Sequence, residues 1–124
     1  MMRLAVVASA VIAIAIGSAA AQSQMELNAQ AGADLRKSDD QLNTVYNKLR
    51  AKISDAGKKN LQVAQQSWLR FRDQECEFET MGTVGGSIHS MIVAICLTRL
   101  TDQRVKDLEA QLNCQEGNLS CGGQ

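Results

Sequence analysis

The sequence predicts an all-α protein: a three-helix antiparallel bundle with a disulfide between its second and third helices and a short polar C-terminal tail. Three observations favour this fold. Apolar residues recur at steps of three, four and seven along three long segments, which is the spacing of one face of an α-helix. No segment of strand length alternates apolar and polar residues. Proline, the strongest helix breaker, is absent.

The first 21 residues have the pattern of a secretory signal peptide. Arg3 supplies a positive charge, residues 4–16 form an apolar run, and the three alanines at 19–21 suit signal peptidase. The apolar run is shorter than the about 20 residues of a membrane-spanning helix. No cysteine occurs before Cys76, so a lipoprotein's attachment site is missing. We therefore expect cleavage after residue 21 and a periplasmic or secreted protein without a membrane anchor.

Without the signal, residues 22–113 are expected to form one helical domain, followed by a short disulfide-closed tail at 114–124. About a hundred residues are enough for one domain with a modest core. Amphipathic patterns within this domain predict helices at 23–56, 60–80 and 88–112. Short connections between these segments favour antiparallel neighbours.

Local signals predict where these helices begin and end. Ser23 and Glu26 have the spacing of a capping box at the start of the first helix. Gly57 is expected to end that helix, and Ser87 to cap the third one. In the second helix, Trp68 and Phe71 are expected to be core residues.

Four cysteines remain in the mature chain: Cys76, Cys96, Cys114 and Cys121. An even number in an exported chain predicts disulfides, and four cysteines allow three pairings. We favour Cys76 with Cys96 and Cys114 with Cys121, because both pairs are local and the first would join two helices. A loop of the first size contributes about 3 kcal/mol in the chain-entropy model. Zinc binding is the alternative, but the chain has no Cys-x-x-Cys pair and one histidine, so we expect no metal and no cofactor.

The composition argues against nucleic-acid binding and catalysis. Acidic and basic residues are equal in number, 13 each, and no polybasic stretch occurs. A nucleophile, a base and oxyanion donors cannot be assembled around the one histidine, so we expect no catalytic residues. The expected partner is another protein.

Two features could contact such a partner. The first is a glycine loop, Gly85-Gly86-Ser87, with His89 beside it. The second is an acidic ridge that could steer a basic protein, and it comprises Asp73, Glu75, Glu77 and Glu79. A tight turn and a solvated helix face are the simpler alternatives for these two features.

Four blocks of residues, mainly polar, aromatic or glycine, occur in order along the helical domain. They are Asp39, Leu42, Asn43 and Tyr46; Gln65, Trp68, Phe71, Arg72 and Asp73; Gly85, Gly86 and Ser87; and Thr101 with Arg104. These blocks resemble the LprI-type lysozyme inhibitors, small exported proteins, over nearly the whole mature chain. The second block, with Gln-x-x-Trp and Arg-Asp-x-x-Cys spacing, is the most specific.

The resemblance implies an all-helical exported domain that inhibits lysozyme by contact, in which the cysteines matching Cys76 and Cys96 are bonded. The motif residues would be mainly structural. The chain lacks the cysteine that many members carry near the start of the first helix, and the Cys114 and Cys121 pair lies outside the pattern. The alternative is a structural or envelope-interaction protein without activity on lysozyme. The sequence does not predict an oligomeric state.

Overall fold

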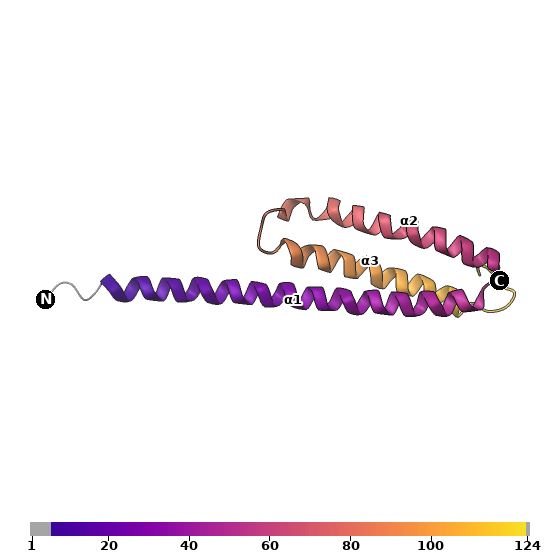
Figure 1. The fold of residues 1–124 in the computed structure, drawn as a ribbon, viewed down its shortest axis with the longest axis horizontal. Coiled ribbons are helices and arrows are strands. Elements are labelled where there is room, and N and C mark those ends of the chain that lie inside the picture. Colours follow the sequence, from indigo (N-terminus) through magenta and orange to yellow (C-terminus); the bar gives the residue numbers. More distant parts are fainter. Residues whose placement is uncertain (1–5, 124) are drawn as a thin grey trace.

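Three helices follow one another in an up-down-up arrangement (Figure 1). The computed structural model describes residues 6–123, with side chains from residue 19 onward. The helices are α1 (Val6–Lys52), α2 (Asp55–Glu79) and α3 (His89–Leu112), and a short 3-10 helix, η1 (Met81–Thr83), lies between α2 and α3. Over residues 6–123 the chain forms no strand. The predicted all-helical bundle is confirmed.

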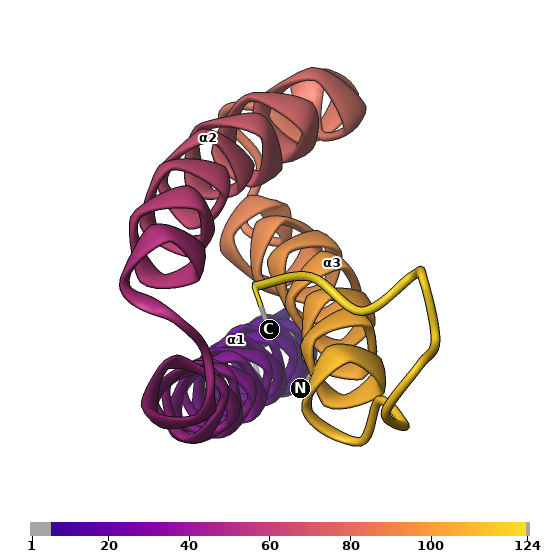
Figure 2. The same cartoon turned by 90° about the vertical axis from the view of Figure 1, so that its right-hand side faces the viewer.

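The helices differ in how closely they associate. α1 and α3 lie side by side and run in the same direction, whereas α2 starts beside the end of α1 and inclines away from it (Figures 1 and 2). The N-terminal part of α1 projects beyond the other two helices (Figure 1). Among the described residues, none of the helices has the length and hydropathy that a membrane crossing requires.

The apolar core lies between α1 and α3. Its buried residues are Leu42, Val45 and Leu49 of α1 and Val105 and Leu108 of α3. The partly buried side chains that pack against this cluster are Tyr46, Ile53, Leu61, Trp68 and Leu112. From α2, Leu61 and Trp68 pack against this cluster, and both are only partly buried. Apolar packing therefore holds α2 less firmly than it holds α1 and α3, and polar contacts and a disulfide contribute to its position.

Two disulfides cross-link the chain. Cys76 of α2 is bonded to Cys96 of α3, with a Cα–Cα distance of 5.7 Å, which confirms the predicted link between the second and third helices. Both cysteines are buried. In the tail, Cys114 is bonded to Cys121 and closes a short loop after α3.

The predicted boundary between the first two helices was wrong. α1 ends at Lys52, and Ser54 caps α2 by accepting a hydrogen bond from the Gly57 amide through its Oγ, at 3.1 Å. Gly57 therefore lies in the first turn of α2 and does not end α1. It is a glycine for another reason: a Cβ there would lie 2.6 Å from Gly123 Cα. The tail crosses the start of α2 at this point, and the Gly123 carbonyl accepts a hydrogen bond from the Ser54 amide at 2.7 Å.

The predicted helix starts also needed correction. α1 begins at Val6, so the expected capping box of Ser23 and Glu26 has no helix end to cap. At α3 the cap position is Ile88, without a side-chain hydrogen bond, and Ser87 instead offers its carbonyl to Asn28 Nδ2 at 3.0 Å.

Substitution of Gly57 tests the contact between α2 and the tail. In an ordinary helix, glycine to alanine stabilises by about 0.5–1 kcal/mol. Gly57→Ala instead forces Cβ into the Gly123 backbone, so we expect the free energy of unfolding to fall by about 1–3 kcal/mol. The Ser54 amide should also exchange its hydrogen faster. Urea unfolding and amide exchange measure both effects.

The matched control is Gly32→Ala in α1. A Cβ at Gly32 would meet the flexible end of Arg36 at 3.6 Å, so this variant should be as stable as the wild type or more so. Equal stabilisation by the two substitutions would show that the tail does not require glycine at position 57.

Candidate partner-binding site

One guanidinium joins all three helices. Arg72 of α2 donates hydrogen bonds to Asp39 Oδ1 of α1 at 3.0 Å and to Thr101 Oγ1 of α3 at 3.2 Å. It also pairs with its neighbour Asp73 at 2.9 Å. The Arg72 side chain is 13% exposed and Thr101 is fully buried, so the bond between them is shielded from water, whereas the Asp39 side chain is 41% exposed. Charge-assisted hydrogen bonds of this kind are stronger than neutral ones.

The tryptophan of the motif lies between two arginines. The Arg72 and Arg104 guanidinium carbons are 5.5 and 5.8 Å from the centre of the Trp68 ring, within the range of cation–π attraction. Arg104 Nε also donates to Gln65 Oε1 at 3.0 Å. Burial lowers the pKa of Arg104, and the nearby Asp107 carboxylate partly offsets this shift.

The motif residues therefore converge largely on one structural cluster. Leu42 lies in the apolar core and Tyr46 packs against it. Asn43 is exposed and does not pack against the core. Phe71 was expected in the core, but it is 53% exposed.

The turn between α2 and α3 has a different character. We call residues 77–89, from the end of α2 to the start of α3, the tip. Large apolar side chains are exposed here, and they are Phe78, Met81, Val84 and Ile88. Gly85, Gly86 and Ser87 are exposed as well, and Gly85 has φ +83°, a conformation that favours glycine. An exposed apolar cluster on a loop is a feature of protein interaction sites.

The predicted acidic residues take different positions. Glu79 pairs with Arg99 of α3 at 2.7 Å, and Asp73 pairs with Arg72. Glu75 is half-buried, whereas Glu77 is exposed and forms no ion pair with the described side chains.

A pocket of about 400 Å³ lies between α2 and α3 beside the tip. Asp73, Glu77 and His89 supply its polar lining, and the other lining residues are Cys76, Thr80, Val84, Val93 and Leu97. The structure thus brings together three of the residues that the sequence singled out.

His89 is held by the tip through its ring. The Thr83 hydroxyl lies 2.8 Å from His89 Nδ1, within hydrogen-bond distance, and 3.0 Å from the Thr80 carbonyl. Within residues 6–123, no three metal-ligating side chains gather at a common point.

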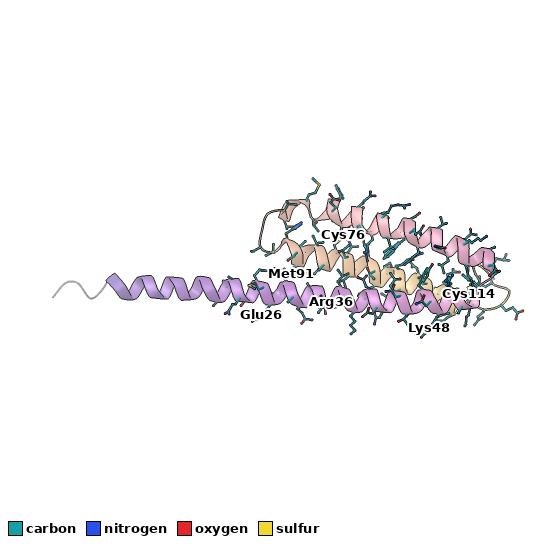
Figure 3. All side chains as sticks on the ribbon, in the orientation of Figure 1. Glu26, Arg36, Lys48, Cys76, Met91 and Cys114 are labelled. Carbon is teal, nitrogen blue, oxygen red and sulfur yellow. A yellow bond between two sulfur atoms is a disulfide. The ribbon has the colours of Figure 1, made fainter. Side chains whose placement is uncertain are left out.

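Charges are separated along the bundle. Residues 22–35 and 73–98 lie toward the tip and contain six acidic residues, of which Asp73 and Glu79 pair with the flanking Arg72 and Arg99. The two segments meet where Gln24 Nε2 approaches Met91 Sδ at 3.9 Å. Residues 48–59, at the opposite end, contain five basic residues and one acidic residue. In Figure 3, Glu26 and Met91 lie toward the tip end and Lys48 lies toward the other end.

Sequence reasoning missed a second cavity at the end of the bundle opposite the tip, which we call the base. There the last turns of α1 and α3, the first turns of α2 and the tail line a partly open cavity of about 300 Å³. The glycines at 122 and 123 were a signal of close backbone contact, but their partner Gly57 is distant in sequence.

Comparison with known proteins agrees with the fold and the motif. Residues 16–108 match the family described as Lysozyme inhibitor LprI. An uncharacterised protein of Rhizobium meliloti (strain 1021) is 32% identical over 109 residues, which cover 77% of this chain and 78% of the relative. The crystal structure of a DUF1311 family protein from Pseudomonas putida KT2440 superposes with a TM-score of 0.67 at 18% identity, over 73% of this chain and 94% of that one. This last similarity supports the shared fold.

Replacement of Arg72 tests whether the motif holds the helices together. Arg72→Gln removes the charge that bonds Asp39 and Thr101, so we expect the free energy of unfolding to fall by about 2–4 kcal/mol. Urea unfolding measures the loss. Arg70→Gln is the control, because Arg70 is exposed on the same helix and bonds only Ser67 among the described side chains, at 3.4 Å. It should change stability by less than about 0.5 kcal/mol. Equal losses of stability in the two variants would show that Arg72 does not hold the helices together.

Proposed function

The chain belongs to the LprI family of lysozyme inhibitors, and from this membership we propose that it is an exported protein that binds a lysozyme and blocks its cleft. It acts by contact between proteins and not by catalysis. We place the lysozyme-binding surface at the tip on one observation: exposed apolar side chains and a glycine loop lie there beside Glu77, which forms no ion pair with the described side chains.

The shape and composition of the tip support insertion into a groove. Phe78, Met81 and Val84 are 65–72% exposed, so a partner that covered them would gain apolar burial. The loop of Gly85 and Gly86 carries no side chains that would limit its entry into a narrow cleft. Small loops on rigid helical scaffolds often carry recognition.

The charge of the tip supports a basic partner. Lysozymes of the common animal type are basic. Residues 77–89 contain no lysine or arginine, and although Glu79 is paired with Arg99 of α3, Glu77 forms no ion pair with the described side chains. Opposite charges steer association and raise its rate. Glu77 contributes most directly, because it is exposed and lines the pocket beside the tip.

We also propose cleavage of the signal after Ala21. Gln22 would then be the first residue, two positions before Gln24, whose side chain approaches Met91 of α3. Asn28, four residues later, bonds the Ser87 carbonyl of the tip loop. The part of α1 that projects beyond the bundle in Figure 1 would be largely removed, and the mature helix would begin close to the tip. The predicted positive charge of the signal, at Arg3, lies outside the described residues.

The mass of the exported protein shows whether the signal has been cleaved. When the full-length chain is expressed in a bacterium, the protein in the periplasmic fraction should begin at Gln22, and intact-mass spectrometry reads this directly. Ala21→Lys should block processing, because signal peptidase needs a small residue at this position. A periplasmic product that retains residues 1–21 would contradict cleavage.

Lysis assays test the inhibition. The exported protein is added to bacterial cells with several lysozyme types, and the loss of turbidity is followed. We expect slower lysis by at least one basic lysozyme. Glu77→Lys should weaken this inhibition at least tenfold, because it places a positive charge against a basic partner.

Glu109→Lys is the matched control, with the same charge change on an exposed position of α3 away from the tip. It should inhibit like the wild type. Unchanged lysis at a large molar excess, for every lysozyme tested, would reject inhibition and favour a different partner in the cell envelope.

A further inference from the structure

The cavity at the base has the make-up of a small-molecule site. Apolar side chains from the three helices and from the turn between α1 and α2 form most of its wall, and they are Leu49, Ile53, Leu61, Ala64 and Leu108. Its volume of about 300 Å³ is at the small end of the range for ligand pockets, roughly 300–1,000 Å³. Its polar lining side chains are Asn60, Gln111 and Arg104.

The tail forms one wall of this cavity and is fixed in place. Gly122 and Gly123 line the cavity, and Gly123 bonds the Ser54 amide at 2.7 Å. Gln111 of α3 binds the tail twice, by accepting from the Gly122 amide at 2.7 Å and donating to the Ser120 carbonyl at 3.0 Å. Figure 2 views this end and shows the tail crossing from α3 over the bundle. The Cys114–Cys121 bond limits how far the tail can move away.

Arg104 supplies a cationic group to the same cavity. Its Nε is bonded to Gln65, and its guanidinium lies against the Trp68 ring. No carboxylate among the described side chains lies within ion-pair distance of it. A half-buried charge of this kind has lost part of its hydration, and burial correspondingly lowers its pKa. An anion placed in the cavity would compensate the charge.

We propose that the base cavity binds a medium-chain aliphatic carboxylate, with its acyl chain against the apolar wall and its carboxylate on Arg104. The guanidinium fork matches the geometry of a carboxylate, and its remaining N–H groups can donate to both oxygens. This site is separate from the tip and does not depend on binding to lysozyme.

Trp68 makes the binding observable. It is the one tryptophan of the chain, and its ring lies 5.8 Å from the Arg104 guanidinium carbon. The protein exported from the full-length chain is titrated with octanoate, decanoate, decanol and decylammonium below their micelle concentrations. We expect a saturable change in tryptophan fluorescence with decanoate, and about tenfold tighter binding of decanoate than of octanoate because two more methylenes are buried.

The head groups test the role of Arg104. Decylammonium should bind at least tenfold more weakly than decanoate, and decanol should fall between them. Arg104→Lys keeps the charge and should keep this order, whereas Arg104→Gln should remove the preference for decanoate over decanol. Arg70→Gln is the control for loss of an exposed arginine from the neighbouring face of α2 and should bind like the wild type.

A filled cavity tests the location. Ala64→Phe places a ring in the cavity and should abolish the response, whereas Ala51→Phe, at an exposed position of α1 outside the cavity, should leave it intact. Thermal melts by circular dichroism confirm that each variant is folded. If Arg104→Gln does not fold, Ala64→Phe and the head-group series on the wild type decide the question. The absence of a saturable response, equal binding of decanoate and decylammonium, or unchanged binding by Ala64→Phe would overturn the proposal.

Discussion

The arrangement of this bundle depends on the Arg72 guanidinium. The apolar core joins α1 to α3, and α2 adds two side chains to its edge, Leu61 and Trp68. Arg72 reaches Asp39 on one neighbouring helix and buried Thr101 on the other, and so it fixes α2 against both. A largely shielded charge with its hydrogen bonds satisfied restricts the position of a helix more sharply than apolar contact does, since its geometry is directional. The Cys76–Cys96 disulfide fixes one end of α2, contact with the tail fixes the other end, and Arg72 fixes the middle.

This division separates the arginine and tryptophan residues of the family motif from the tip, where the glycine block of the motif belongs to the proposed binding surface. The arginines at 72 and 104 and Trp68 are committed to contacts within the bundle. The tip, in contrast, exposes apolar side chains that make little contribution to the core. A scaffold that is held rigid by its middle can present such a loop without reordering it, and this lowers the entropic cost of binding. The base, with its opposite charge and its cavity, is a third region, and it shares Arg104 with the motif.

Much of the fold could be predicted from sequence because its determinants are local. Helical periodicity predicted three helices, and the spacing of Cys76 and Cys96 favoured the correct pairing. The errors came from tertiary contacts. Gly57 has the sequence signature of a helix end, yet its lack of a side chain serves contact with Gly123. Phe71 was assigned to the core by its apolar character, but Arg72 takes the inward position next to it. The sequence placed Asp73, Glu77 and His89 on one candidate contact surface. It did not predict the pocket that they line, because that pocket depends on the angle between two helices.

The bond between Arg72 and Asp39 positions α2. A double-mutant cycle measures the coupling free energy of these two residues directly. The free energy of unfolding is compared for the wild type, Asp39→Asn, Arg72→Gln and the double variant, all with the disulfides intact. Residues in one hydrogen-bonded network show coupling energies of about 0.5–3 kcal/mol, and we expect a stabilising coupling of at least about 1 kcal/mol. Additive effects of the two substitutions, with coupling near zero, would contradict the account.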